Sequence, residues 1–497
     1  MRTFHYSIII LFLISVAVSV HARTSEQIQA ASAAFVVSNT NDSGAGSLRQ
    51  AISDVTPGGT ITFSGNLHIK LDSQLTISKN MTIDAGSRNI TIDAQKKSRV
   101  FNIGPDANVT LIGLTITGGF AVPDNHPNDP FFRGSEGGGI HTEGTLTVEK
   151  CTISGNNAYK GGGIYAYYVK DYTNNPTPPS KILTLKDSII SDNSACGTWW
   201  YNPGGRYETH YKEGGGIYVR NYTYTYPNDV PLTIISNCTI SGNIAGNGGG
   251  FHGGYITTIM YCKIFGNKGI DEHDGSGRIE GGGICCGSQS MTIINCSITK
   301  NTLTSSNQWA PNTSGGGIHS QSDRFLLRNS TVSGNSAGGP HGSGGGIYSR
   351  SPEWAILYNS IIAQNTANGT GNGEGPDICN GLRGHSTDTY CNVQGYYNLT
   401  TFTGWNGGAS NNVPYNSGSP LFVNAANDNY RLAAGSQAID KGNNTYATDG
   451  IIEYELLPGK PLTADLDGNK RIVNGVVDIG AYEYDRSDPA KSATTLR

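Results

Sequence analysis

Short runs in which apolar and polar residues alternate recur along the chain, and each run ends in asparagine. In residues 146–156 the apolar side chains occupy positions 146, 148, 151 and 153, and the alternation breaks once, at Lys150. A period of two predicts β-strands, and the break predicts a tight corner between two of them. The run occurs seven times, with its last residue at Asn156, Asn193, Asn243, Asn267, Asn301, Asn335 and Asn365.

A glycine triplet followed by Ile or Phe precedes each run. The triplets begin at Gly137, Gly161, Gly214, Gly248, Gly281, Gly315 and Gly344. A third short strand is expected after each triplet, and three such strands cannot bury an apolar face alone, so successive copies must stack. The pattern therefore predicts an all-β parallel β-helix in which each inward side chain lies over its counterpart in the next coil.

Two polar features of the repeat predict ladders along the stack. The residue five positions before each final Asn is always Cys or Ser, and the corner residue before it is Asn or Asp in five copies but Lys150 and Tyr261 in the others. Asn and Asp tolerate the left-handed backbone that a sharp corner needs. We expect the final Asn residues to stack, each amide bonding to the coils above and below and to backbone groups at the corner.

The ends of the chain differ from the repeats. Residues 1–22 have the charged start, apolar core and small-residue cleavage site of a secretory signal peptide. No later stretch is apolar enough to cross a bilayer, so we expect a secreted or cell-surface protein without a transmembrane segment after signal removal. All nine cysteines follow residue 22, which favours an oxidising compartment, and a disulfide between Cys379 and Cys391 is predicted.

The remaining chain divides into four parts. Residues 35–119 are expected to form an N-terminal cap and the first, less regular coils, with a short helix that starts at Ser47 as N-cap and has Gln50 completing a capping box. The regular coils should span 120–375. Further coils and an irregular C-terminal cap should span 376–484, and a polar tail follows at 485–497.

Three motif groups resemble known families. The segment 39–52 and the later 59–63 and 114–119 resemble the CSLREA-type N-terminal region of bacterial secreted right-handed β-helix proteins. The segments 419–424, 435–442, 465–471 and 477–484 resemble the choice-of-anchor Q domain, and the repeated tetrapeptides are similar to those of polymorphic outer membrane proteins. These resemblances imply a right-handed, pectin-lyase-like solenoid with a C-terminal cap that precedes surface attachment.

Composition narrows the function classes. The 68 glycines and the apolar share of 36% suit a thin solenoid better than a thick globular core. The formal net charge of −4 is close to neutral for 497 residues, so nothing in the charge favours nucleic acid or an anionic membrane as a partner. Function is instead expected in loops between coils, because the coils are committed to packing.

Aromatic residues gather in the enlarged spacers between residues 165 and 226. Flat rings with polar edges suit stacking on sugar rings, and the alternative is that these rings pack on one another to hold long loops. The candidate ligand-binding residues are Tyr168, Trp199, Trp200, Tyr207, His210, Tyr211, Arg220 and Tyr222.

Titratable residues are densest at 271–280. The candidates for acid–base chemistry there are Asp271, Glu272, His273, Asp274 and Arg278, and the alternative is a solvated acidic turn. The catalytic motif set of polygalacturonases is incomplete in this chain. Asp465 and Asp467 form an oxygen-rich turn that is a candidate calcium site. The leading hypothesis is a surface β-helix of adhesin-like role that binds carbohydrate or another cell-envelope glycan, and the rival is a polysaccharide lyase or glycoside hydrolase.

Overall fold

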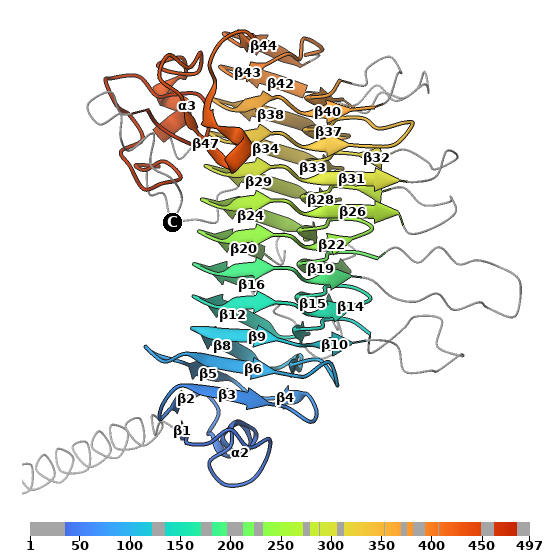
Figure 1. Ribbon diagram of the computed structural model, residues 1–497, viewed down its shortest axis with the longest axis vertical. Coiled ribbons are helices and arrows are strands. Elements are labelled where there is room, and N and C mark those ends of the chain that lie inside the picture. Colours follow the sequence, from blue (N-terminus) through green and yellow to red (C-terminus); the bar gives the residue numbers. More distant parts are fainter. Residues whose placement is uncertain are drawn as a thin grey trace, which may run out of the picture.

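The computed structural model describes thirteen stretches of the chain. They are residues 35–121, 135–169, 181–195, 212–222, 232–271, 279–287, 289–305, 313–351, 353–368, 375–380, 393–405, 407–448 and 462–484. These residues wind into a tall right-handed parallel β-helix, with the N-terminal end and the last coil at opposite ends of the long axis (Figure 1). The predicted fold class is therefore confirmed.

Each regular coil contains four strands. One coil comprises β11 (Ile140–Thr142), β12 (Thr145–Glu149), β13 (Thr152–Ser154) and β14 (Asn157–Ala158), and the next coil begins with β15 (Ile164–Val169). β11 and β15 pair in parallel with Ile140 opposite Ile164. The sequence predicted only three strands per copy. The fourth was missed because a two-residue strand after the Asn is too short to show alternation.

The strands form four long parallel sheets, which we call A to D. Sheet A contains β1 (Phe35–Val37), β2 (Gly59–Phe63), β5 (Met81–Asp84), β8 (Asn108–Ile112), β12, β16 (Lys181–Lys186), β20 (Leu232–Ser236), β24 (Ile256–Met260), β29 (Ser290–Ile294), β34 (Arg324–Arg328), β38 (Trp354–Tyr358), β42 (Val393–Tyr396) and β44 (Gly408–Ser410). Sheet B contains β3 (Leu67–Lys70), β6 (Ile90–Asp93), β9 (Leu114–Thr117), β13, β17 (Ile189–Ser191), β21 (Thr239–Ser241), β25 (Lys263–Phe265), β30 (Ser297–Thr299), β35 (Thr331–Ser333), β39 (Ile361–Ala363), β43 (Leu399–Thr400) and β45 (Val413–Pro414).

Sheets C and D complete each coil. Sheet C contains β4 (Leu75–Ile77), β7 (Phe101–Ile103), β11, β15, β19 (Ile217–Tyr222), β23 (Phe251–Gly253), β28 (Ile284–Cys286), β33 (Ile318–Ser320), β37 (Ile347–Ser349) and β41 (Ile378–Cys379). Sheet D contains β10 (Phe120–Ala121), β14, β18 (Ser194–Ala195), β22 (Ile244–Ala245), β26 (Lys268–Asp271), β31 (Thr302–Ser305), β36 (Ser336–Ala337) and β40 (Thr366–Ala367). Two short strands, β27 (Ile279–Glu280) and β32 (Thr313–Ser314), pair beside sheet D.

The inward side chains form one continuous apolar core. In β12, Leu146 and Val148 are fully buried while the residues between them are half-buried. The same alternation places Ile153 in the core from sheet B and Ile140 from sheet C. Each such side chain contributes about 1.5–3 kcal/mol when it is fully removed from water, so stacking of the coils supplies the main stabilisation.

The predicted asparagine ladder is present. From Asn156 to Asn365, each Nδ2 donates to the Oδ1 of the next Asn at 2.9 to 3.0 Å. The same Oδ1 also accepts the backbone N–H of the preceding Asn, as Asn267 does from Asn243 at 3.1 Å. The ladder ends on Asp377, whose Oδ1 accepts from both nitrogens of Asn365. Corner backbone groups that no strand pairing reaches are thereby satisfied.

The Cys and Ser positions form a second ladder. The backbone N–H of Cys151 donates to Ser188 Oγ at 3.1 Å, and that of Cys262 donates to Cys296 Sγ at 3.4 Å. Every corner residue before this position in the seven copies has positive φ, including the two exceptions, Lys150 at 53° and Tyr261 at 52°. The left-handed corner expected from the sequence is therefore confirmed in all seven copies.

The N-terminal end is covered by α2 (Leu48–Asp54). Ser47 Oγ accepts the backbone N–H of Gln50 at 3.2 Å, as an N-cap should, and Leu48, Ala51 and Ile52 are buried. The expected capping box is only half present. The Gln50 side chain donates to Asp54 at 2.8 Å, four residues later, instead of reaching back to the N-cap.

The C-terminal region runs back along the side of the upper coils (Figure 1). It contains β46 (Phe422–Asn424), η1 (Ala425–Asn427), β47 (Asn429–Leu432) and α3 (Asn444–Thr448). Asn359 and Asn443 exchange two hydrogen bonds of 2.9 Å, and the Ala481 N–H donates to Thr331 Oγ1 at 3.1 Å. These contacts bury the outer faces of β30, β35 and β39, whereas the outer faces of β13 and β21 are half-buried.

The described helices are short. The longest, α2, has seven residues. Within the described stretches no helix has the length and apolar character needed to cross a bilayer. The expected signal peptide, residues 1–22, lies outside these stretches, as does the tail 485–497.

Candidate functional site

Insertions in the repeat border one sheet. Between β10 and β42, the long spacers between strands lead from sheet D to sheet C or from sheet C to sheet A. The spacers that contain residues 122–134, 196–211, 272–278, 306–312 and 369–374 fall at the first corner, and those that contain 170–180, 223–231 and 381–392 fall at the second. Loops carry most functional residues in repeat folds. The outer face of sheet C, which lies between these two corners, is therefore the candidate functional site.

A column of aromatic and titratable side chains runs along this outer face. The residue after each Gly-Gly-Gly-Ile or Gly-Gly-Gly-Phe points outward, because the Ile or Phe before it is in the core. Neighbouring rings are in contact. The centroids are 5.2 Å apart for His141 and Tyr165, which stack, 5.4 Å for Tyr165 and Tyr218, which are tilted, and 5.1 Å for Tyr218 and His252, which meet edge to face. From the third coil upward the column reads His141, Tyr165, Tyr218, His252, Cys285, His319, Tyr348 and Cys379.

A second column, at the residue before each glycine triplet, carries charge. The backbone of Lys160 forms isolated parallel β-bridges with that of Glu136 on one side and that of Glu213 on the other. The Lys160 ammonium lies 2.5 Å from Glu213 Oε2 and 5.4 Å from the centre of the Tyr218 ring. Further up, Glu280 Oε2 lies 3.7 Å from His319 Nε2. The side chains of Lys160 and Glu213 keep 20% and 15% of their surface exposed, so this column is partly open to solvent.

Burial sets the protonation states on this face. It lowers the pKa of His141 to about 3, with the nearby Arg99 adding to the effect, and it also lowers the pKa values of His252 and His319. Burial opposes ionisation of Glu213 as well, but the Lys160 ammonium, through its charge and its hydrogen bond, holds the pKa of Glu213 below its ordinary value. The face therefore presents neutral imidazoles beside an ionised carboxylate at neutral pH.

Two polar groups distinguish this face. The Nδ1 atom of His252 is buried and has no hydrogen-bond partner within the described part of the chain. Arg220 lies two residues after Tyr218 on β19, half-buried, with its guanidinium 5.8 Å from the centre of the Tyr167 ring. The Arg220 guanidinium is charged, unlike the rings of the column, and it also interacts with Tyr165.

The structure brings part of the predicted aromatic site to this face. Arg220 is on it, and the backbones of Tyr168 and Tyr222 lie at the adjoining ends of β15 and β19, where Val169 pairs with Tyr222. Trp199, Trp200, Tyr207, His210 and Tyr211 lie outside the described residues, in the stretch that leads into β19. Their role in ligand binding stays a prediction.

The predicted acidic cluster lies at the same corner. The backbone of Asp271 ends β26 and pairs with Ser305. Glu272, His273, Asp274 and Arg278 lie outside the described residues. Their acid–base role stays a prediction. The cluster leads directly into Glu280, which does reach the outer face of sheet C.

The candidate calcium turn has its oxygens engaged by protein groups. Asp465 accepts backbone N–H groups from Asp467, Asn469 and Glu483 at 2.7 to 3.0 Å, and Asp467 binds Arg431 Nε at 2.5 Å. N–H donors and a guanidinium occupy the positions that a cation would need, so this geometry does not favour calcium. The described residues contain no group of three or more His, Cys, Asp or Glu side chains arranged for a metal ion.

Only one cysteine of the predicted disulfide lies within the described residues. Cys379 is buried at the end of β41, directly above Tyr348 in the outer column of sheet C. Cys391 lies outside the described residues, so the pairing stays a prediction.

The two columns on sheet C were not identified from the sequence. The signal was present, since the residue after each Gly-Gly-Gly-Ile or Gly-Gly-Gly-Phe is His, Tyr or Cys in all seven copies. It was overlooked because attention went to the long spacers, and a single residue per copy has meaning only when the copies are superposed in register.

Known proteins show only distant similarity to this chain. No protein-family model matches the chain, and no curated protein matches it. The CSLREA-type, choice-of-anchor Q and outer-membrane-protein resemblances therefore have no support from a family match. Among solved structures, pectate lyase Pel9A is similar with a TM-score of 0.47 and 13% identity over 91% of this chain and 96% of its own. The periplasmic alginate epimerase AlgG has a TM-score of 0.28 and 12% identity over 77% of this chain and 82% of its own.

Fold and site together define the class of this molecule as a parallel β-helix protein. The aromatic and titratable side chains of the two columns lie on the outer face of sheet C. Similarities at 12 to 13% identity do not bear on activity. A functional assignment must therefore rest on the residues of this face.

Proposed function

We propose that this protein is exported and binds an extended polysaccharide of the cell envelope along the outer face of sheet C. One observation carries the proposal: a column of His, Tyr and Cys side chains, most of them buried, lies beside a partly exposed charged column, and the long spacers of the central coils border this face. Rings suit sugar faces, and charged or amide groups suit their hydroxyls and carboxylates. A solenoid repeats these groups at about 4.8 Å per coil, which suits a repeating polymer.

Arg220 and Lys160 give the proposed binding face its cationic groups. Arg220 lies by Tyr167 and interacts with Tyr165, whereas Lys160 lies by Tyr218 and is partly engaged with Glu213. A guanidinium binds a carboxylate or a pair of hydroxyls through two parallel N–H groups. Acidic polysaccharides such as pectin and alginate are therefore the first ligands to test.

Binding can be tested with purified protein and four glycans. Affinity electrophoresis in pectin, alginate, chondroitin and arabinan should show retardation by at least one. Arg220→Ala should weaken that retardation about tenfold, because a charge-assisted hydrogen bond contributes about 1.5–3 kcal/mol. Arg88→Ala is the matched control, since Arg88 is exposed in the first coils, away from this face. Equal loss in both variants, or no retardation by any glycan, would refute the proposal.

Cleavage of the polysaccharide is the second candidate function. It is favoured by His252, whose neutral imidazole lies in the field of Glu213 and Glu280. A neutral imidazole beside carboxylates is suited to proton abstraction. Release of unsaturated products or reducing ends that disappears in His252→Gln would establish this function. Turnover lost instead in Asp271→Asn or Asp274→Asn would place the chemistry in the acidic segment predicted from sequence.

Export is the remaining part of the proposal. It rests on the signal-peptide pattern of residues 1–22 and on the position of every cysteine after it. Expression of the full chain in a secreting host should yield mature protein that begins near residue 23, as read by intact-mass measurement. A product that keeps residues 1–22 and stays inside the cell would contradict export.

A further inference from the structure

The two ends of the solenoid are finished differently. Helix α2 covers the N-terminal end, whereas the last strands, β44 and β45, form the final rung of sheets A and B. The second ladder ends at Asn412, whose Oδ1 accepts from the backbone N–H of Asn398 at 2.8 Å. In Asn398 the amide donates both to the coil below and to Asn412, but Asn412 has no further coil above it among the described residues.

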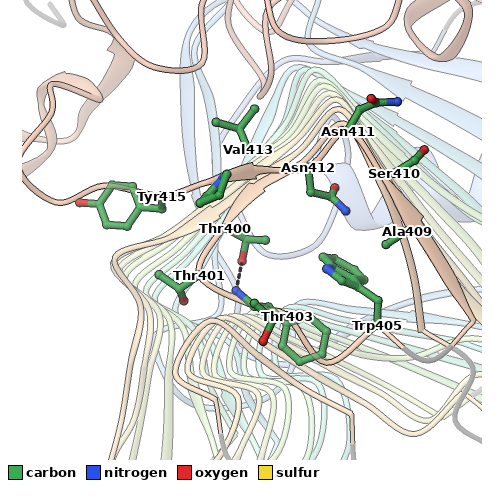
Figure 2. A pocket seen from close by; sticks show the side chains of 12 residues that line it. Thr400, Thr401, Thr403, Trp405, Ala409, Ser410, Asn411, Asn412, Val413 and Tyr415 are labelled. Carbon is green, nitrogen blue, oxygen red and sulfur yellow. Dashed lines mark hydrogen bonds between the residues drawn. The ribbon is translucent and has the colours of Figure 1, made fainter.

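A cavity of about 500 Å³ opens at this end (Figure 2). Its lining combines the rings of Phe402, Trp405 and Tyr415 with polar groups such as Thr401, Ser410 and Asn412. None of the twelve lining residues has a charged side chain. Aromatic faces with hydroxyl and amide groups around them, and no net charge, match the chemistry of a neutral sugar.

The indole of Trp405 packs against Gly395 and Phe402. A Cβ added to Gly395 would lie 2.2 to 2.6 Å from three carbons of the six-membered indole ring, so the glycine backbone packs against one face of that ring. Phe402 meets Trp405 in an edge-to-face contact at 4.9 Å between centroids. Trp405 is half-buried, and the remainder of its indole lines the cavity (Figure 2).

The edge of the last rung is unsuited to another β-strand. The N–H groups of Val413 and Tyr415 donate to the rung below, to Asn398 and Thr400. By the alternation of a strand, the group at position 414 faces the open end, and Pro414 has no N–H to offer there. End-to-end pairing with a second copy is therefore disfavoured, while a small ligand can enter the cavity.

We infer that this cavity is a binding site for a neutral saccharide, separate from the face of sheet C. The saccharide would pack one ring against the half-buried indole of Trp405 and bind its hydroxyls to Ser410, Asn412 and Thr401. A terminal sugar unit fits this end site better than the middle of a polymer, because the solenoid stops here. The inference does not depend on polysaccharide binding by sheet C.

The test uses three neutral probes and one anionic probe of equal length. Cellohexaose, xylohexaose and mannohexaose are titrated into the full mature chain by calorimetry, with hexagalacturonate as comparator. At least one neutral probe should bind, and its affinity should fall about tenfold or more in Trp405→Ala, as expected when an aromatic anchor is truncated. Ser410→Trp should have the same effect by filling the cavity, and because Ser410 is exposed this variant should keep its fold.

Each other outcome identifies a different explanation. Absence of binding by all three neutral probes, or binding unchanged in both variants, would overturn the inference. If only Arg220→Ala loses binding of the neutral probe, the saccharide site lies on sheet C instead of in this cavity. Concentration-dependent dimers that Ser410→Trp abolishes, without saccharide binding, would assign the end to a second copy. Trp405→Phe, which keeps a ring over Gly395, should retain the melting temperature and part of the affinity.

Discussion

Replacing Asn267 in the middle of the asparagine ladder should destabilise the protein strongly. Its Oδ1 accepts the backbone N–H of Asn243 at 3.1 Å and the Asn243 Nδ2 at 2.9 Å, and its Nδ2 donates to Ile240 and Asn301, both at 2.9 Å. Alanine would leave two buried donors of Asn243 without partners. At about 1–3 kcal/mol for each, the cost is about 2–6 kcal/mol, a large part of the about 5–15 kcal/mol that stabilises a domain.

Aspartate at the same position should be no better than alanine. It could still accept from Asn243, but its second oxygen would face the acceptors of Ile240 and Asn301. The natural carboxylate at the top of the ladder avoids this conflict, because Asp377 Oδ2 accepts the Thr401 hydroxyl at 2.5 Å. An Asp is therefore suited to the end of the ladder and unsuited to its interior.

The assay is urea unfolding followed by circular dichroism, with amide hydrogen exchange to locate the loss. The exposed neighbour Lys268→Ala serves as control and should change stability by less than about 0.5 kcal/mol. Faster exchange should appear first around Asn243 and Asn301, since a repeat protein can open near a damaged coil. An Asn267→Asp variant as stable as the parent would refute the ladder as a stabilising element.

Three further predictions follow from the same geometry. Lys150→Asn should raise the melting temperature, because Lys150 has a φ of 53° at an exposed corner that Asn adopts with less strain, a gain of about 0.5–1 kcal/mol. Gly249→Ala should impair folding, since a Cβ there would lie 2.5 Å from the Gly282 carbonyl oxygen. Gly65→Ala is the control: a Cβ at position 65 meets no atom within 4 Å, so this variant should leave the melting temperature nearly unchanged. Burial raises the pKa of Glu483 to about 9 despite the nearby Arg471. The folded state then holds a proton that the unfolded state releases above its ordinary value of 4.5, so stability should fall as pH rises from about 5 to about 9, and the slope should flatten in Glu483→Gln.

The coil architecture was predictable because each of its structural features has a local signal in the repeat sequence. Alternation gives the strands, Asn or Asp at the corner gives positive φ, and one Asn per copy at a fixed distance gives the ladder. Even the exceptions Lys150 and Tyr261 adopt the corner conformation, because the six other copies and the stacking above and below fix the backbone there. Tertiary context overrides the residue's own preference at these two positions.

Other features could not be read from the sequence. The fourth strand has two residues and no period of its own. The path of the C-terminal region depends on contacts such as Thr331 with Ala481, which are 150 residues apart and leave no periodic trace. The candidate site was predicted as two loop clusters, and only Arg220 and the strand ends of Tyr168, Tyr222 and Asp271 fall within the described residues.

The positions at which the coils agree and those at which they differ indicate that the outer face of sheet C is functional. At the glycine, inward and ladder positions, packing or hydrogen bonding restricts which residue fits, and the copies hardly differ there. The outward positions of sheet C need only a residue that tolerates a strand, yet they hold imidazoles and phenols beside Lys160, Glu213 and Glu280. Insertions between β10 and β42 also avoid the corners of sheet B and fall at the two corners of sheet C. Because strand formation requires neither these side chains nor these insertions, their coincidence on one face is best explained by a ligand that lies along it.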